Sequence, residues 1–275
     1  MLNSRHYGNT VDESRRILRE AYGVLRVHPR FLAWPFAALV ATVVLWGGVA
    51  APTLMVTSTL SDAQSAGVLI VAIEFFVVFF LTGVLWCWFN VALTYGLSAA
   101  LRGESLALSH ALKMASSKWV RIVGWVAFSA TVGAVMRIVS NALGGTLGRI
   151  VQHASFFAWA GATYYITPIL AFEELPVVDS LKRSATLLAK YPRVTIASNI
   201  ILQIAVTAAL LVPIAAAVGA GYYVGTYSTA SLMARGAVGV AGAAAVLIFF
   251  AMVIGLNALQ SSVRVVLYRS ARVVS

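Results

Sequence analysis

The stretch GVLIVAIEFFVVFFLTGVLWCWFNVALTYGLSAAL, residues 67–101, decides the fold class of this chain, because Glu74 is its only charged residue. A helix that crosses a bilayer needs about 20 mostly apolar residues. This run exceeds that length, so a helix over it would tilt or project beyond the bilayer. We therefore predict that residues 67–101 form a membrane-spanning helix.

Further apolar runs of spanning length lie on both sides of this stretch. The composition agrees with them: 60% of the 275 residues are hydrophobic and 11% are charged, whereas soluble domains have about 45–50% and about 25%. A soluble helical core could not bury this much apolar surface. The sequence predicts an all-α, polytopic membrane bundle of six transmembrane helices in one integral membrane domain, residues 1–275. The other five spans are predicted at about 31–56, 119–140, 151–172, 194–218 and 236–263.

The basic residues are distributed unevenly along this six-helix path. The chain has 20 Lys and Arg against 9 Asp and Glu, and a formal net charge of +11. One side of the membrane receives all of the basic residues except Arg137, Arg149 and Arg235. Since Lys and Arg accumulate on the cytoplasmic side, we predict a multi-pass protein of the inner (plasma) membrane with both termini in the cytoplasm. Basic side chains at membrane edges favour anionic lipid headgroups over nucleic acid as the partner.

Three polar connections on the predicted cytoplasmic side have apolar residues at helical spacing. They cover residues 12–28, 104–117 and 176–191, and each precedes a predicted span. A helix with one apolar and one basic face lies in the membrane interface, so we predict three cytoplasmic interfacial amphipathic helices. Their candidate contacts to anionic lipid or to a partner are Arg15, Arg16, Arg19, Lys113, Lys182 and Arg183.

These helices resemble copies of one another. When Leu18 is set over Leu181, Pro29-Arg30 falls on Pro192-Arg193 without a gap. This correspondence predicts a threefold internal repeat, in which each unit is an amphipathic helix followed by two spans. The alternative is that a proline before a span simply starts that helix. The predicted repeat units are 12–102, 104–175 and 176–270.

Several polar residues fall within the predicted spans. Glu74 is the acid placed furthest inside an apolar run, and an intramembrane carboxylate suggests a bound cation or proton. The alternative is that Glu74 lies near the outer interface, within reach of Arg137 or Arg149. Residues at intervals of four from Asn90 form a polar stripe that would suit close helix packing or the lining of a pore. The candidate intramembrane polar residues are Glu74, Asn90, Thr94, Ser98, Asn257 and Gln260.

An acidic pair, Glu173-Glu174, ends the fourth predicted span. We predict that it forms interface ion pairs with Lys182, Arg183 or Arg193 and thereby holds the third amphipathic helix. The sequence has no His-Glu-x-x-His motif, no Gly-x-Ser-x-Gly nucleophile elbow and no phosphate-binding Gly-Lys loop, so we expect no enzyme activity, no cofactor and no metal.

The stretch PILAFEE, residues 168–174, followed by DSLKRS, residues 179–184, resembles a signature of uncharacterised six-helix bacterial and archaeal integral membrane proteins. These are related to the membrane domain of glycerophosphoryl diester phosphodiesterases. The resemblance implies a six-helix membrane domain. It implies no phosphodiesterase activity, because the catalytic barrel of those enzymes is absent from this sequence.

The sequence favours a non-catalytic integral membrane protein, either a permease-like subunit or a lipid-facing membrane scaffold. The alternative is a channel or transporter with a polar path that involves Glu74 and Asn90. A membrane-embedded lipid enzyme is the least favoured interpretation, since no cluster of acid, base or metal ligands can be assembled. The expected partners are the lipid bilayer and its anionic headgroups, with a homo-oligomer or a membrane partner as further options.

Overall fold

The structure of the chain is a computed structural model that describes residues 10–59, 64–190 and 232–273, and individually residues 192, 195, 207, 211, 215, 218, 219 and 222. Over these residues the secondary structure is helical, without a strand. The elements are α1 (Thr10–Val27), η1 (Pro29–Leu32), α2 (Ala33–Thr59), α3 (Gln64–Ala100), α4 (Leu108–Ser116), α5 (Trp119–Leu143), α6 (Gly145–Ala162), α7 (Ile166–Phe172), α8 (Val177–Lys190) and α10 (Leu232–Val273).

Four of these helices are long and apolar enough to cross a membrane. The qualifying segments are Pro29–Val49, Val71–Ala100, Trp119–Leu143 and Leu247–Ala271, which correspond to the first, second, third and sixth predicted spans. The prediction of an all-helical membrane protein therefore agrees with the structure at this level. The fifth predicted span, 194–218, lies outside the described residues except for a few single positions, so the number six stays a prediction.

The fourth predicted span, 151–172, is not one continuous helix, and this part of the prediction was wrong. Helix α6 ends at Ala162, a turn covers residues 163–165, and α7 begins at Ile166. Pro168 supplies the physical reason, because it has no N–H for the carbonyl of residue i−4 and its ring clashes with that carbonyl. For Pro168, residue i−4 is Tyr164, which lies within the turn. Pro168 itself stands in the first turn of α7, where a proline is tolerated.

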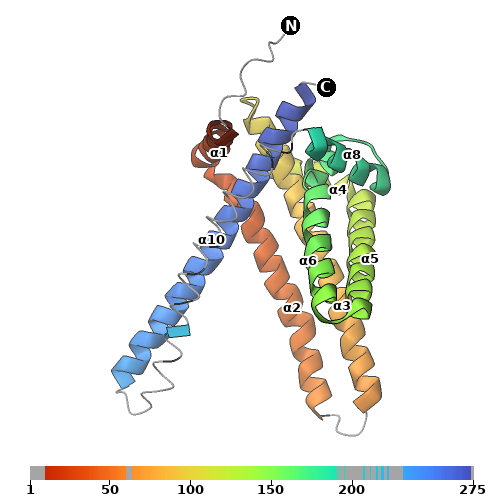
Figure 1. Ribbon diagram of the computed structural model, residues 1–275. Coiled ribbons are helices and arrows are strands. Elements are labelled where there is room, and N and C mark those ends of the chain that lie inside the picture. Colours follow the sequence, from red (N-terminus) through yellow and green to blue (C-terminus); the bar gives the residue numbers. More distant parts are fainter. Residues whose placement is uncertain are drawn as a thin grey trace.

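The helices form two antiparallel hairpins that share one crowded end (Figure 1). Helices α2 and α3 make the longer hairpin, α5 and α6 the shorter one, and α3 contacts α2, α4, α5, α7 and α10. Helices α1, α4 and α8 and the C-terminal part of α10 lie at the same end. We call this the capped end, and we include in it the acidic linker, residues 173–176, between α7 and α8. Its side of the membrane stays a prediction.

The buried core is concentrated toward the capped end. Along α3, every residue from 91 to 99 is buried, whereas Leu69, Phe76 and Phe79 in the opposite half are exposed. A second group of buried side chains joins α1, α7, α8 and α10 through Ile17 and Tyr268, among others. The exposed apolar side chains in the opposite half of α3 are suited to contact with lipid. The tight packing that positions polar groups lies at the capped end.

Glycines close the α5–α6 hairpin at its other end. Gly144 and Gly145 have φ of 60° and 48°, a region that side chains other than glycine rarely adopt. A Cβ on Gly148 would lie 2.3 Å from the carbonyl oxygen of Ser140. Gly148 therefore lets the two helices of this hairpin approach each other, while Gly144 and Gly145 form the turn between them.

The predicted repeat stays a prediction. In units 12–102 and 104–175 a short helix precedes a hairpin, but the middle hairpin ends in the broken α6–α7 segment. Most of the first span of unit 176–270 lies outside the described residues.

Candidate functional site

The acidic linker at the capped end is the most connected polar site. At Glu173 the backbone leaves helical geometry with φ −112° and ψ 140°. Successive side chains of an extended backbone point to opposite sides, so Glu173 and Glu174 reach different helices. The exit from α7 thus converts two consecutive acids into two separate contacts.

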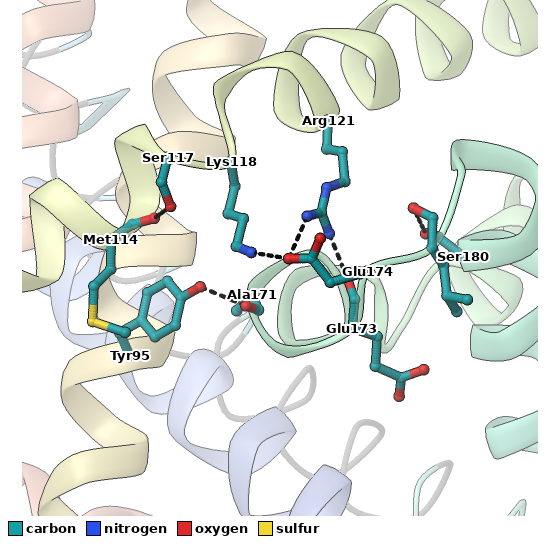
Figure 2. A network of polar contacts seen from close by, with 10 residues as sticks. Tyr95, Met114, Ser117, Lys118, Arg121, Ala171, Glu173, Glu174 and Ser180 are labelled. Atoms are coloured by element: carbon teal, nitrogen blue, oxygen red, sulfur yellow. Dashed lines mark hydrogen bonds and ion pairs between the residues drawn. The ribbon is translucent and has the colours of Figure 1, made fainter.

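Glu174 contacts the start of α5. Its Oε1 forms ion pairs with Lys118 Nζ and, at 2.7 Å, with Arg121 Nη2. Arg121 Nη1 also donates a hydrogen bond of 2.6 Å to the backbone carbonyl of Glu173 (Figure 2). Hydrogen bonds from Lys118 and Arg121 lower the pKa of the Glu174 carboxyl from 4.5 to about 2. The carboxylate is exposed, but both cations are mostly covered.

Glu173 contacts α8 and α10. Arg183 Nε lies 3.3 Å from its Oε2, and the Tyr268 hydroxyl donates a hydrogen bond of 2.7 Å to its Oε1. The Glu173 side chain is 15% exposed, so water screens these contacts less than those of Glu174. Of the partners predicted for the acidic pair, Arg183 is in contact with Glu173, Lys182 pairs instead with Asp179 at 3.3 Å, and Arg193 lies outside the described residues.

Further hydrogen bonds attach the segments on either side of the acidic linker. The Tyr95 hydroxyl of α3 donates to the carbonyl of Ala171 in α7 at 2.5 Å. The backbone N–H of Tyr165 donates to the Ser184 hydroxyl of α8 at 3.1 Å. The α7–α8 region is therefore held by polar contacts to α3, α5 and α10.

The comparisons with known proteins concern this same part of the chain. A sequence family described as a family of unknown function (DUF6159) matches residues 65–274. The chain belongs to the DUF6159 family. The match runs from α3 to the end of α10 and contains the whole acidic linker, whereas α1 and α2 precede it.

No curated protein and no solved structure matches the chain. Nothing in these comparisons links this DUF6159 chain to glycerophosphoryl diester phosphodiesterase membrane domains, so that resemblance stays a prediction.

The Asn90 stripe of this DUF6159 protein faces α10. Ser261 Oγ donates to Asn90 Oδ1 at 3.0 Å, and Asn90 Nδ2 donates to the carbonyl of Trp86 at 2.7 Å. Thr94 and Ser98 are buried. Asn257 and Gln260 are partly buried on the same helix as Ser261. Asn90 thus forms a polar contact between α3 and α10, whereas the Thr94 hydroxyl donates to the carbonyl of Asn90 within α3.

Glu74 is remote from the acidic linker, in the other half of α3. It is partly buried, and its Oε1 is inaccessible and lacks a hydrogen-bond partner within the described residues. Arg137 and Arg149 are exposed, and neither forms an ion pair with it in the part of the chain that the structure describes. The structure therefore does not bring together the predicted intramembrane residues Glu74 and Asn90 by any direct contact.

The predicted lipid-contact residues lie on the outside of the capped end. The exposed ones are Arg15, Arg16, Arg19, Lys113 and Lys182, whereas Arg183 is partly buried against Glu173. The opposite sides of the same helices are buried, through Ile17 and Ala21 in α1 and Leu187 in α8, for example.

Sequence reasoning did not identify Lys118, Arg121, Tyr95 or Tyr268 as partners within this site. Lys118 and Arg121 belong to the basic connection between the second and third predicted spans, and no local pattern relates them to an acidic pair more than 50 residues later. Among the described residues, no group of three His, Cys, Asp or Glu side chains could hold a metal ion.

Proposed function

We propose that this chain is a non-catalytic membrane scaffold whose capped end binds anionic lipid headgroups through exposed Arg and Lys side chains. The observation that carries the proposal is the burial pattern of α1. Ile17 and Ala21 are buried against the bundle, while Arg16 and Arg19 are exposed on the other side of the helix. The helix is held by protein packing, so its basic face remains available to lipid.

Exposed aromatic side chains at the same end support an interfacial position. Tyr22 of α1 is 59% exposed and Trp119, the first residue of α5, is 50% exposed. Tyr and Trp concentrate at the level of lipid headgroups, because their rings are amphipathic. Lys and Arg near an anionic surface each contribute about 1 kcal/mol to lipid association.

The test compares lipid enrichment around the full chain in mixed nanodiscs of phosphatidylglycerol and phosphatidylcholine. After extraction, retained lipids are counted by mass spectrometry for the wild type and for the triple variant Arg16→Gln/Arg19→Gln/Lys182→Gln. At about 1 kcal/mol per residue, we expect each substitution to reduce phosphatidylglycerol enrichment about fivefold.

The matched control is Arg137→Gln/Arg149→Gln, which removes exposed basic residues from the α5–α6 hairpin. We expect it to leave the enrichment unchanged. Equal enrichment in the wild type and the triple variant would contradict the proposal, as would enrichment that is insensitive to salt.

A second candidate function, transport, is favoured by Glu74 alone. Its Oε1 is buried and has no hydrogen-bond partner among the described residues, and a carboxylate within an apolar helix is a candidate ligand for a cation or a proton. Glu74→Gln should change solute flux in vesicles reconstituted with the full chain, whereas Glu104→Gln, at an exposed acid paired with Arg102, should not. Absence of flux for every solute tried would argue against transport.

A further inference from the structure

Arg264 of α10 is a cation without an anionic partner among the described residues. It is partly buried, and its Nε is inaccessible and has no hydrogen-bond partner in the part of the chain that the structure describes. Its guanidinium carbon lies 5.6 Å from the centre of the Tyr164 ring, which is the range of a cation–π contact. The ring orients the guanidinium but does not neutralise its charge.

Three other partly buried cations of this end, Lys118, Arg121 and Arg183, contrast with Arg264, whereas Arg269 of α10 is also partly buried and forms no ion pair within the described residues. Arg121 and Arg183 each contact a carboxylate of the acidic linker. A charge removed from water is costly unless it is paired, and within a membrane span such a charge marks a functional site by default. Arg264 lies inside the candidate span Leu247–Ala271, so its missing partner requires an explanation.

The break between α6 and α7 is a second, independent observation at the same place. Tyr164 belongs to the turn 163–165 that interrupts the predicted fourth span. Non-helical backbone at membrane depth occurs where it is buried in protein or lines a cavity, and broken helices commonly form binding sites in membrane proteins.

Thr163 and Tyr165 of this turn already have hydrogen-bond partners, in contrast to Arg264. The Tyr165 N–H donates to Ser184 Oγ, and the Tyr165 hydroxyl lies 2.7 Å from Thr195 Oγ1. The Thr163 hydroxyl donates to the carbonyl of Trp159 at 2.8 Å. These groups of the turn are satisfied within the protein, whereas Arg264 Nε beside them has no hydrogen-bond partner among the described residues.

We propose that Arg264, held on the Tyr164 ring at the α6–α7 break, binds a phosphate group. A guanidinium presents a planar fork of donors that matches phosphate oxygens. Arg264 precedes Tyr268 by one helical turn, about 6 Å, and Tyr268 contacts the acidic linker at the capped end. That depth is close to the headgroup region, so the phosphate belongs to a membrane lipid or is taken up free from water.

This site uses none of the residues of the proposed lipid-binding surface. If the Arg and Lys variants showed no loss of anionic-lipid enrichment, binding of a single phosphate at Arg264 would be unaffected. The two proposals can therefore be disproved independently.

The test measures thermal unfolding of the purified full chain in detergent with three separate additions. These are short-chain phosphatidic acid, diacylglycerol with the same acyl chains, and inorganic phosphate. At saturation we expect phosphatidic acid to raise the unfolding temperature by about 5 °C or more, and diacylglycerol to leave it unchanged. An equal rise with inorganic phosphate assigns the site to free phosphate. No rise with either phosphate compound, or an equal rise with diacylglycerol, overturns the proposal.

Variants separate this role from a structural one. Arg264→Gln should abolish the rise and, without ligand, unfold at the same or a higher temperature, because an unpaired buried charge has been removed. Arg183→Gln is the matched control: it should unfold at a lower temperature without ligand and keep the rise. If Arg264→Gln does not fold, Arg264→Lys keeps the charge but loses the fork, and about tenfold more phosphatidic acid should be needed. A full rise in Arg264→Gln, or an unchanged requirement for phosphatidic acid in Arg264→Lys, overturns the proposal.

Discussion

Glu173 and Glu74 are both partly buried acids, but they lie in different halves of the molecule and differ in their partners. At the capped end, Glu173 contacts Arg183 and Tyr268, and its neighbour Glu174 contacts Lys118 and Arg121. In the other half of α3, the buried oxygen of Glu74 has no hydrogen-bond partner within the described residues. Charged side chains thus join helices at the capped end, whereas Glu74 in the other half of α3 joins none among the described residues.

The difference shows which charged residues contribute to stability. A paired carboxylate at the capped end fixes the position of a segment, since removing one partner leaves the other desolvated and unsatisfied. An unpaired carboxylate or guanidinium within a span destabilises the fold and is retained where it binds something. The comparison can be tested by removing charges from each region in turn.

The largest loss should follow Arg121→Gln. This substitution removes the contacts of 2.7 Å to the Glu174 carboxylate and of 2.6 Å to the Glu173 carbonyl, and we expect it to lower the free energy of unfolding by about 2 kcal/mol. The measurement is reversible unfolding in mixed micelles. Lys113→Gln, at an exposed residue of α4, should change stability by less than about 0.5 kcal/mol. Equal losses of unfolding free energy in the two variants would contradict the prediction that contacts of the acidic linker stabilise the fold more than an exposed charge does.

A smaller loss should follow Tyr268→Phe. The variant keeps the buried ring but removes the hydroxyl that donates to Glu173 Oε1, which should cost about 1 kcal/mol of unfolding free energy. Tyr22→Phe is the control, because Tyr22 is exposed on α1. If both variants have the same free energy of unfolding as the wild type, the position of Glu173 does not depend on its contact with α10.

The pH dependence should show a weaker effect at Glu174. Its pKa in the folded protein is about 2, against 4.5 for an unperturbed carboxyl, because Lys118 and Arg121 hydrogen-bond to its charged form. Its contribution to stability is therefore fully present above pH 4.5 and is lost as the pH falls toward 2. Unfolding of the wild type and of Glu174→Gln, compared from pH 6 to pH 2, should converge in this window. Parallel curves would contradict the pairing.

The smallest effect, and the one of opposite sign, should follow Glu74→Gln. No hydrogen-bond partner among the described residues is lost and a partly buried charge is removed, so we expect the free energy of unfolding to stay within about 0.5 kcal/mol of the wild type or to rise. Glu173→Gln provides the comparison and should lower it. A loss of about 1 kcal/mol or more in Glu74→Gln would show that Glu74 is paired and would break the contrast between the two regions.

Some of the fold was accessible from the sequence because it depends on neighbouring residues. The apolar runs at 67–101 and 119–140 became α3 and α5, since hydrophobic length is a local property. The prediction for 151–172 was wrong because it relied on hydrophobic length alone, which suggests one helix. Pro168 divides this run into α6 and α7. Pro168 was the available signal.

The candidate site was accessible only in outline. Glu173 and Glu174 stand out as acids among basic connections, but Lys118 lies 56 residues from Glu174 and Tyr268 lies 95 residues from Glu173. No periodic pattern relates residues at these separations. Similarly, the stripe at Asn90 predicted a packed helix face or a pore lining, and the contact with Ser261 identifies α10 as the helix that it meets.

By itself, the sequence determined that the chain is helical and apolar enough for a membrane, where its longest candidate spans lie, and which connections carry basic residues. These properties follow from composition and from spacing along one helix. Only the tertiary structure decided which charges are paired, that the fourth predicted span is broken beside Arg264, and that α1 presents Arg16 and Arg19 outward. Each of these depends on which helices meet, and that is settled by packing between residues far apart in the chain.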